Sequence, residues 1–161
     1  MTLRFSNQRR ARGFSIVEAM VALIVMSVGM LGIAGLYVSS LKAGRTAILR
    51  TQAVNFASDI ADRIRANRTG KNAYDTTLYA PCTGAPGAGA TAAETAARNL
   101  AATDVCTWRN AVQASLPQAN ISCAFTAGVP AGMPNNYVVT VTWREPGEAA
   151  NFTYQLRIQS S

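Results

Sequence analysis

The residues best placed for chemistry lie near the start of the chain, where Gly13, Phe14 and Glu18 stand at the entrance of a long apolar run. The run extends from Phe14 to Leu41, and Glu18 is its only charged residue. If a peptidase cut after Gly13, the new amino group would lie four residues before Glu18, and residues four apart share a helix face. The ammonium and the carboxylate could then neutralise each other, within one chain or between packed neighbours.

The apolar run is long enough to cross a membrane. At about 1.5 Å per residue, its 28 residues make a helix of about 42 Å, more than the roughly 30 Å hydrocarbon core of a bilayer. A secretory signal has an apolar stretch of only about 7 to 15 residues and a small-residue cleavage site after it, and no such site follows here. A plain signal anchor explains the run but not the Gly13–Phe14 junction. Glu18 then has two readings: an acid held at the headgroup interface, or an acid with a function, as ionisable residues in membrane segments usually are.

This arrangement resembles the class III signal of type IV prepilins, in which a short basic leader ends in glycine and is followed by phenylalanine, with glutamate as fifth residue of the mature chain. The leader here carries Arg4, Arg9, Arg10 and Arg12 and no acid. The resemblance implies that a prepilin peptidase removes residues 1–13 on the cytoplasmic side and methylates the amino group of Phe14. It also implies that Glu18 supports methylation and subunit docking.

The formal charge of +7 is distributed unevenly along the chain. The leader accounts for four positive charges, which leaves 15 − 4 = 11 basic and 8 acidic residues, or +3, after cleavage. Residues 42–68 hold six basic side chains against Asp59 and Asp62, whereas residues 69–161 hold five of each sign. Basic residues beside a membrane span set topology and contact anionic lipid. Because the C-terminal part is neutral by count, we do not expect it to bind nucleic acid.

The cysteines predict one disulfide and one spare thiol in an oxidising compartment, with three alternative pairings. The chain has no histidine and no C-x2-C pair, so we expect neither a zinc site nor any other metal or cofactor. Cys106 should point about 100° away from the apolar stripe of its helix, which contains Val105 and Trp108. We therefore expect the bridge to join Cys82 to Cys123.

The helical pattern continues beyond the membrane run as an amphipathic stem over residues 42–68. Asp59 precedes Arg63 by four and Asp62 precedes Arg65 by three, spacings that support a solvent-exposed face. Gly70 is a candidate C-cap, so one helix should cover about residues 14–67. Its lower part contains Gly29, Gly32, Gly35 and Gly44, which permit close contact between helices in apolar surroundings. The stem stripe recurs at spacings of three and four: Leu49, Ala53, Phe56, Ile60 and Ile64.

Residues 69–161 should form a small globular head. A loop rich in Gly, Ala and Pro runs to Ala90, and Thr91 with Glu94 forms a capping box ahead of an alanine-rich helix. A further helix is expected over residues 104–116, then strands over 121–125, 137–143 and 152–158, with Trp108 and Trp143 in the core. The expected fold is α+β and pilin-like: a long N-terminal helix packed on a small antiparallel sheet.

No constellation for catalysis is present in the sequence. Histidine, the commonest general base, is absent, and there is no G-x-S-x-G sequence and no P-loop. The acids of the head form no paired motif: Asp75, Glu94, Asp104, Glu145 and Glu148. We therefore predict that the chain is not an enzyme.

The order of elements is that of the pilins, and within them the chain looks most like the minor pilins classed as type IV pilus modification proteins. The residues that carry this likeness are 61–68 at the end of the stem, Asp104-Val105, Trp108 and Leu116-Pro117 in the head helix, and 141–144. The resemblance implies a single-pass protein of the bacterial inner membrane with a periplasmic head, which later joins the pilus.

The likeness also implies a role and partners. A minor pilin helps to initiate pilus assembly at or near the tip and so supports twitching motility and adhesion. Its partners would be the prepilin peptidase, other minor pilins, the major pilin, the inner-membrane assembly platform, membrane lipid and, at the tip, an adhesin. Two alternatives share the N-terminal signal: a pseudopilin of a type II secretion system and a DNA-uptake pilin.

Overall fold

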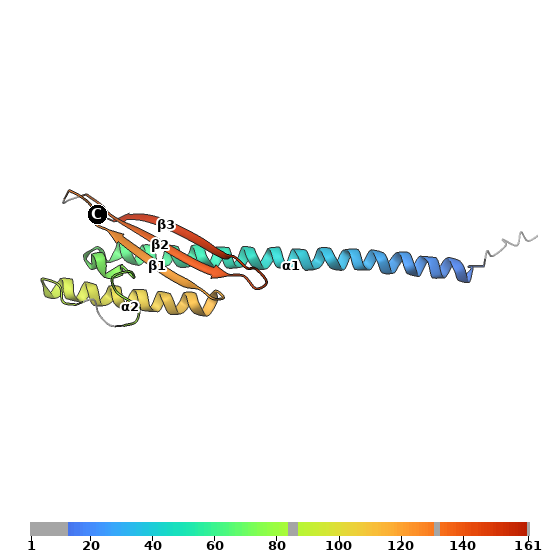
Figure 1. Cartoon of the computed structure of the whole chain (residues 1–161), viewed down its shortest axis with the longest axis horizontal. Coiled ribbons are helices and arrows are strands. Elements are labelled where there is room, and N and C mark those ends of the chain that lie inside the picture. The colour runs from blue at the N-terminus through green and yellow to red at the C-terminus, as the bar shows by residue number, and fades with distance from the viewer. Residues whose placement is uncertain (1–12, 84–86, 131–132, 161) are drawn as a thin grey trace, which may run out of the picture. The chain divides into compact units, whose positions relative to one another are not determined.

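The computed structural model describes residues 13–83, 87–130 and 133–160 of the chain (Figure 1). The chain divides into two compact units, with the boundary between Gly44 and Arg45. The elements are, in order, α1 (Ile16–Ala66), the 3-10 helix η1 (Arg68–Tyr74), α2 (Ala92–Ser115), β1 (Asn120–Thr126), β2 (Asn135–Arg144) and β3 (Asn151–Ser160). The predicted α+β class, with a long first helix and a small antiparallel sheet, is confirmed.

The boundaries of α1 agree with the sequence, but its C-terminal end differs in one respect. The helix stops at Ala66, and Gly70 is not a left-handed C-cap as predicted, because the chain continues directly into η1. Gly70 is buried there, and a Cβ atom would lie 2.9 Å from Nδ2 of Asn67 and 3.0 Å from Cε2 of Tyr74. The glycine is therefore needed for close packing and not for its backbone conformation.

The two helices expected in the head are one, since α2 runs without interruption from Ala92 to Ser115. No glycine or proline lies between Thr91 and Ser115, so nothing in the backbone stops the helix before Asp104. The predicted cap at Thr91 is present: its side chain accepts a hydrogen bond of 3.1 Å from the amide of Glu94. The Glu94 carboxylate reaches back to the amide of Ala90, at 2.8 Å, and not to that of Thr91.

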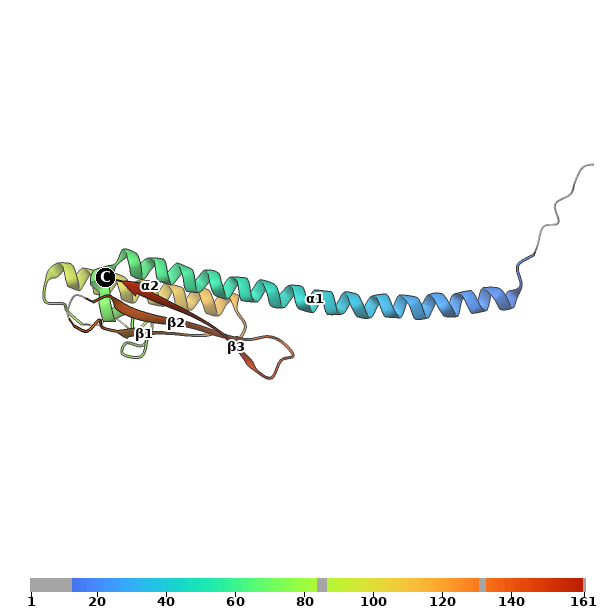
Figure 2. The ribbon, with the colours of Figure 1, turned by 90° about the horizontal axis from the view of Figure 1, so that it is seen from above.

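The sheet is antiparallel with β2 in the middle, and the pairing of β2 with each neighbour is continuous. Val139 lies opposite Cys123 on β1 and Leu156 on β3, so these three side chains share one face. Figures 1 and 2 show this sheet beside the C-terminal part of α1 and beside α2. The predicted inward face of β2 is confirmed, because four alternating residues are buried: Tyr137, Val139, Val141 and Trp143.

The core of the second unit forms where the stem stripe of α1 meets this face. Ile60 and Ile64 are fully buried, as predicted, whereas Phe56 is only partly buried. The indole Nε1 of Trp108 on α2 donates a hydrogen bond of 2.9 Å to the backbone carbonyl of Phe56, which joins the two helices. Trp143 stacks on Phe152, with the ring centroids 5.9 Å apart, and its buried Nε1 has no partner within the described part of the chain.

Two isoleucines of α1 test this packing. We expect Ile60→Ala, which opens a cavity at a residue with no exposed surface, to lower the free energy of unfolding by about 2 to 5 kcal/mol. Ile48→Ala, at a residue 60% exposed, should change it by less than about 0.5 kcal/mol. The measurement is denaturant unfolding of the full chain in detergent micelles, followed by tryptophan fluorescence. Equal losses for the two variants would contradict this packing.

Candidate processing and assembly site

The predicted processing site lies at the first residues that the structure describes. Gly13, Phe14 and Ser15 precede α1 in irregular backbone, and all three are exposed. No atom lies within 4 Å of the place where a Cβ of Gly13 would stand, and Phe14 is 76% exposed. This junction is therefore open to a protease. The leader arginines, residues 4 to 12, lie outside the described residues.

Glu18 occupies the first turn of α1. A carboxylate there faces the partial positive charge of the unpaired backbone amides at a helix N-terminus, which typically contributes about 0.3 to 1 kcal/mol. An amino group created at Phe14 would lie one helical turn before it. The backbone supports that spacing, because the amide of Ala19 already donates to the carbonyl of Ser15, at 3.2 Å. The arrangement can pair one positive with one negative charge at the entrance of an apolar helix.

The N-terminal part of α1 exposes an unbroken apolar surface. Its large apolar side chains, from Phe14 to Leu41, are each more than half exposed. By length and composition α1 can cross a membrane, and no part of the relevant window is buried within the chain. Gly29, Gly32 and Gly35 likewise have no atom within 4 Å of a Cβ position. This surface has no partner within the described chain, and its small residues leave room for another helix to approach closely.

The stem carries the ion pairs predicted for its exposed face. Arg63 lies 3.1 Å from Asp59, and Arg65 lies 2.7 Å from Asp62. Arg63 also makes a pair that was not predicted, because its Nη1 donates to Oδ1 of Asp104 on α2, at 2.9 Å. Hydrogen bonds to Asp104 and Asp59 raise the pKa of Arg63. Arg63 therefore forms one ion pair on the exposed face of the stem and a second one that links the stem to α2 of the head.

The second oxygen of Asp104 belongs to a buried polar cluster between α1, η1 and α2. The hydroxyl of Tyr74 donates to Oδ2 of Asp104, at 2.9 Å, and Asn67 donates to the carbonyl of Ala97, at 2.7 Å. Burial and the neighbouring carboxylate raise the pKa of Tyr74, which remains a neutral donor. Asp104 was predicted to begin a helix but lies inside α2. It follows the buried Ala101 by three residues and precedes the buried Trp108 by four, so it lies on the same face of the helix. That spacing was the only signal for its burial.

A second acid, Asp75, closes one edge of the sheet. Its Oδ2 accepts from the backbone amide of Phe125 on β1, at 2.9 Å, and its Oδ1 accepts from the amide of Thr77, at 2.8 Å. The next residue, Thr76, donates its amide to the carbonyl of Cys123, at 2.9 Å. The hydroxyl of Thr76 accepts from the amide of Cys123, also at 2.9 Å. The segment after η1 thus hydrogen-bonds the edge of β1 that faces away from β2.

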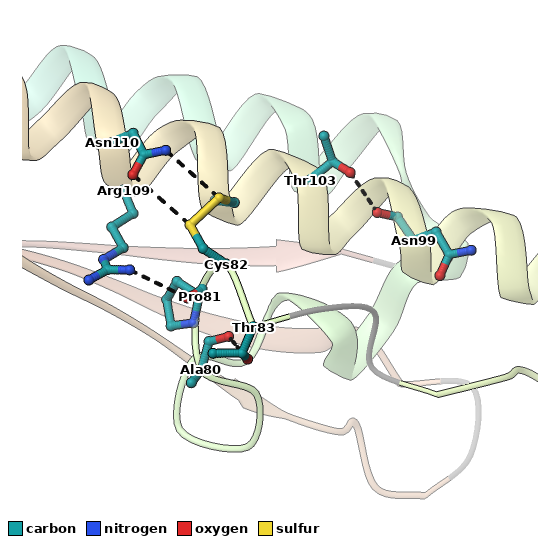
Figure 3. Close-up of a disulfide and its surroundings, with 9 residues drawn as sticks. Ala80, Pro81, Cys82, Thr83, Asn99, Thr103, Arg109 and Asn110 are labelled. Atoms are coloured by element: carbon teal, nitrogen blue, oxygen red, sulfur yellow. Dashed lines mark hydrogen bonds between the residues drawn. A yellow bond between two sulfur atoms is a disulfide. The ribbon is translucent and has the colours of Figure 1, made fainter.

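The predicted disulfide is wrong. Cys82 pairs with Cys106, and Cys123 is the free cysteine. Figure 3 shows the disulfide joining the loop that carries Cys82 to α2, where Cys106 is only partly buried. Arg109 holds the same loop through the carbonyl of Pro81, at 3.4 Å. A position off the apolar stripe of α2 therefore does not exclude Cys106 from the bridge, because the Cys82 loop reaches it there.

Cys123 lies on β1 with its side chain in the core and no exposed surface. Burial, with a smaller effect of the Asp75 charge, raises the pKa of its thiol to about 12. The thiol is therefore neutral and shielded from solvent at ordinary pH. Among the residues that the structure describes, no three cysteine, aspartate or glutamate side chains are grouped as metal ligands would be.

Two family models match the chain. Residues 8–34 match the prokaryotic N-terminal methylation motif, and residues 35–106 match the type IV pilin Tt1218 family. The chain has the signal and the domain of a type IV pilin. No match was found among curated proteins or among solved structures.

The two matches meet within α1, between residues 34 and 35. The methylation motif contains the Gly13–Phe14 junction, Glu18 and most of the exposed apolar helix, and it implies processing by a prepilin peptidase and assembly with other pilins. The Tt1218 match covers the rest of α1, η1 and the part of α2 that ends at Cys106. The protein is a component of a pilus or of a pseudopilus, and its family is structural, not enzymatic. The sheet lies outside both matches.

The disulfide of this pilin can be tested directly. We expect non-reducing peptide mapping to recover the Cys82 and Cys106 peptides as one linked species, also in Cys123→Ala. Cys106→Ser should lower the free energy of unfolding by about 3 kcal/mol, because the bridge closes a loop with a sequence separation of 24. A linked Cys82–Cys123 peptide would restore the original prediction.

The free thiol gives a second test. At pH 8.5 iodoacetamide should leave Cys123 unmodified in the folded pilin and alkylate it after unfolding without reductant, when its pKa returns to about 8.5. Because the folded-state pKa is the raised one, the stability linked to this thiol is complete below about pH 8.5 and is lost as the pH rises toward 12. Mass spectrometry of the Cys123 peptide gives the modified fraction. Rapid alkylation in the folded state would show that the thiol is not buried.

Proposed function

We propose that this pilin is a minor pilin of the PilV type, the type IV pilus modification protein, which helps to initiate pilus assembly at or near the tip. Twitching motility and adhesion would depend on it through the pilus. The observation that carries the proposal is the accessible Gly13–Phe14 junction placed one turn before Glu18, at the entrance of an exposed apolar helix. Assembly needs such a surface, because the helix must exchange lipid for other subunits.

The proposed mechanism begins with cleavage after Gly13 and methylation of the Phe14 amino group. The methylated amine keeps its positive charge and can approach the carboxylate of Glu18, in its own chain or in a neighbour. Neutralisation lowers the cost of moving Glu18 into apolar surroundings, since an unpaired charge there is expensive. Pairing with a neighbour would also fix the axial position of the incoming subunit.

The proposed location is the inner membrane before assembly, with residues 14–41 spanning it, residues 42–68 as stem and residues 69–161 as a periplasmic head. The disulfide between Cys82 and Cys106 supports a head exposed to an oxidising compartment. Lys42, Arg45 and Arg50, all exposed, lie where they can meet anionic headgroups. The partners proposed are the prepilin peptidase, other minor pilins, the major pilin, the assembly platform and a tip adhesin.

A pseudopilin of a type II secretion system is the second candidate, because it would use the same processing site and the same apolar helix. The two differ in their neighbours. Crosslinking in living cells from a photoreactive residue at the exposed Ile33, followed by identification of the linked chain, separates them. Linkage to pilus subunits supports the first candidate, and linkage to secretion pseudopilins supports the second.

The intact mass of the membrane-extracted protein tests processing. We expect a chain that begins at Phe14, carries one additional methyl group and lacks two hydrogen atoms because of the disulfide. A chain that begins at Met1, or after Leu41, would exclude the proposed processing. The same spectrum reports the disulfide separately, so the two conclusions can fail independently.

Two variants test the roles of the individual residues. Gly13→Leu should block cleavage, and Glu18→Ala should block methylation or docking, so that each reduces incorporation into pili by at least about tenfold, which corresponds to about 1.4 kcal/mol. Glu148→Ala is the matched control, because it removes an exposed acid of the head. The yield of the subunit in sheared pili is the measurement, with tryptophan fluorescence to verify a folded head. Normal incorporation of either variant would refute the role of that residue.

A further inference from the structure

The two outer edges of the sheet are treated differently by the fold. The edge of β1 is covered, since Asp75 and Thr76 take up the backbone groups of Cys123 and Phe125. The edge of β3 is not, because in the described chain no segment besides β2 forms a strand pair with it. Two of the usual protections of an edge are absent from β3, since its ten residues contain no proline and pair with β2 without a bulge, and Arg157 is its only charged residue. Figure 1 shows β3 as an outer strand of the sheet.

The free hydrogen-bonding groups of β3 can be assigned from the pairing. The backbone of Cys123 points away from β2, toward Thr76, so its pair with Val139 is not hydrogen-bonded. In an antiparallel sheet the backbone of Val139 then points toward β3 and bonds Leu156. By alternation along β3, the amides and carbonyls that face outward belong to Thr153, Gln155, Arg157 and Gln159.

An apolar row runs along this edge on the core side of the sheet. Phe152, Tyr154 and Leu156 pack against the core, but each is only partly buried. Their counterparts at the centre of the sheet, Val139 and Val141, have no exposed surface. The core is therefore left incomplete beside the free edge, at the place where the side chains of one more strand would lie.

The surface around this edge is positively charged, although the head is neutral by count. Three of its five acids are buried: Asp75, Asp104 and Glu145. Arg157 projects from β3 on the outer face, Arg144 lies at the end of β2, and Arg50 of α1 lies 5.3 Å from the ring centroid of Phe152. None of these three arginines forms an ion pair with an acid of the described chain.

We propose that the β3 edge binds an extended segment of another exported protein, in which apolar residues alternate with acidic ones. The segment would add a fourth strand to the sheet. Its backbone would bond the outward groups of Gln155 and Arg157, and its apolar side chains would lie beside Tyr154 and Leu156. Its carboxylates would fall on the outer face, within reach of Arg157. This binding needs an exported head but does not depend on the proposed role at the pilus tip.

A second copy of the same chain is the obvious competitor for this edge, and charge argues against it. The sequence of β3 contains no acid, so two β3 strands side by side would bring Arg157 of each copy to a partner with no carboxylate. An acidic segment satisfies both the backbone and the arginines. Nucleic acid would satisfy the arginines but would leave the backbone groups and the apolar row unused.

The test uses the full chain in detergent micelles and a synthetic decapeptide of alternating valine and glutamate, with lysine in place of glutamate in the control peptide. We expect the glutamate peptide to slow hydrogen exchange of the Thr153, Gln155 and Arg157 amides by about tenfold. The Tyr154 and Leu156 amides, already bonded to β2, should change little. Exchange is read residue by residue with fragmentation mass spectrometry.

Gln155→Pro is the decisive variant, because it removes an amide that faces the free edge and breaks no bond to β2. It should keep the slow exchange of Tyr154 and Leu156 while the glutamate peptide no longer protects Thr153 and Arg157. Gln155→Thr, the matched control, should bind the peptide as before. Equal protection by the lysine peptide, or none by either, would overturn the proposal. So would protection by duplex DNA at low salt in place of the peptide, or protection that grows with protein concentration alone, which would assign the edge to a second copy.

Discussion

The structure depends on one requirement placed on α1: its C-terminal part must bury an apolar stripe in a soluble head, while its N-terminal part has no core of its own to enter. Ile60 and Ile64 have no exposed surface, whereas Ile24 and Leu31 are more than half exposed on the same helix. Fully burying one such side chain contributes about 1.5 to 3 kcal/mol. The head therefore holds its part of the helix firmly, and the remainder keeps its apolar surface for lipid or for other subunits.

A head of this size buries little surface, and its polar contacts add connections that a small core alone does not supply. Asp104 joins α2 to both α1 and η1, Asp75 fastens the segment after η1 to β1, and the disulfide fixes the adjoining loop to α2. Each of these contacts ties two parts of the chain that are distant in sequence. Because these acids are buried, the exposed surface of the head carries more basic than acidic side chains. Its surface charge is therefore positive, although the net charge of its sequence is zero.

The fold could be predicted wherever the signal was local. Periods of three to four residues identified α1, and strict alternation identified the inward face of β2 from Tyr137 to Trp143. Gly70 was misjudged because the chain continues into η1 and does not stop after α1, and Asp104 because its partners Arg63 and Tyr74 come from other elements. The disulfide was misjudged for the same reason: the direction of Cys106 was correct, but nothing near it in sequence showed that the Cys82 loop would cross that face. The junction at Gly13 and Phe14 could be found from the sequence because its signal is local, and the structure leaves both residues exposed ahead of α1.

The two tryptophans make the packing of the head accessible to fluorescence measurements. Trp108 on α2 is hydrogen-bonded to the carbonyl of Phe56, whereas the indole nitrogen of Trp143 on β2 is buried without a partner among the described residues. Their indoles therefore differ in hydrogen bonding, one at the contact between helices and the other stacked on Phe152 within the sheet. Separation of α2 from α1 would break the hydrogen bond of Trp108, whereas the indole nitrogen of Trp143 has no such bond to lose among the described residues. The chain thus contains two native fluorophores that can distinguish which layer of the head loosens first.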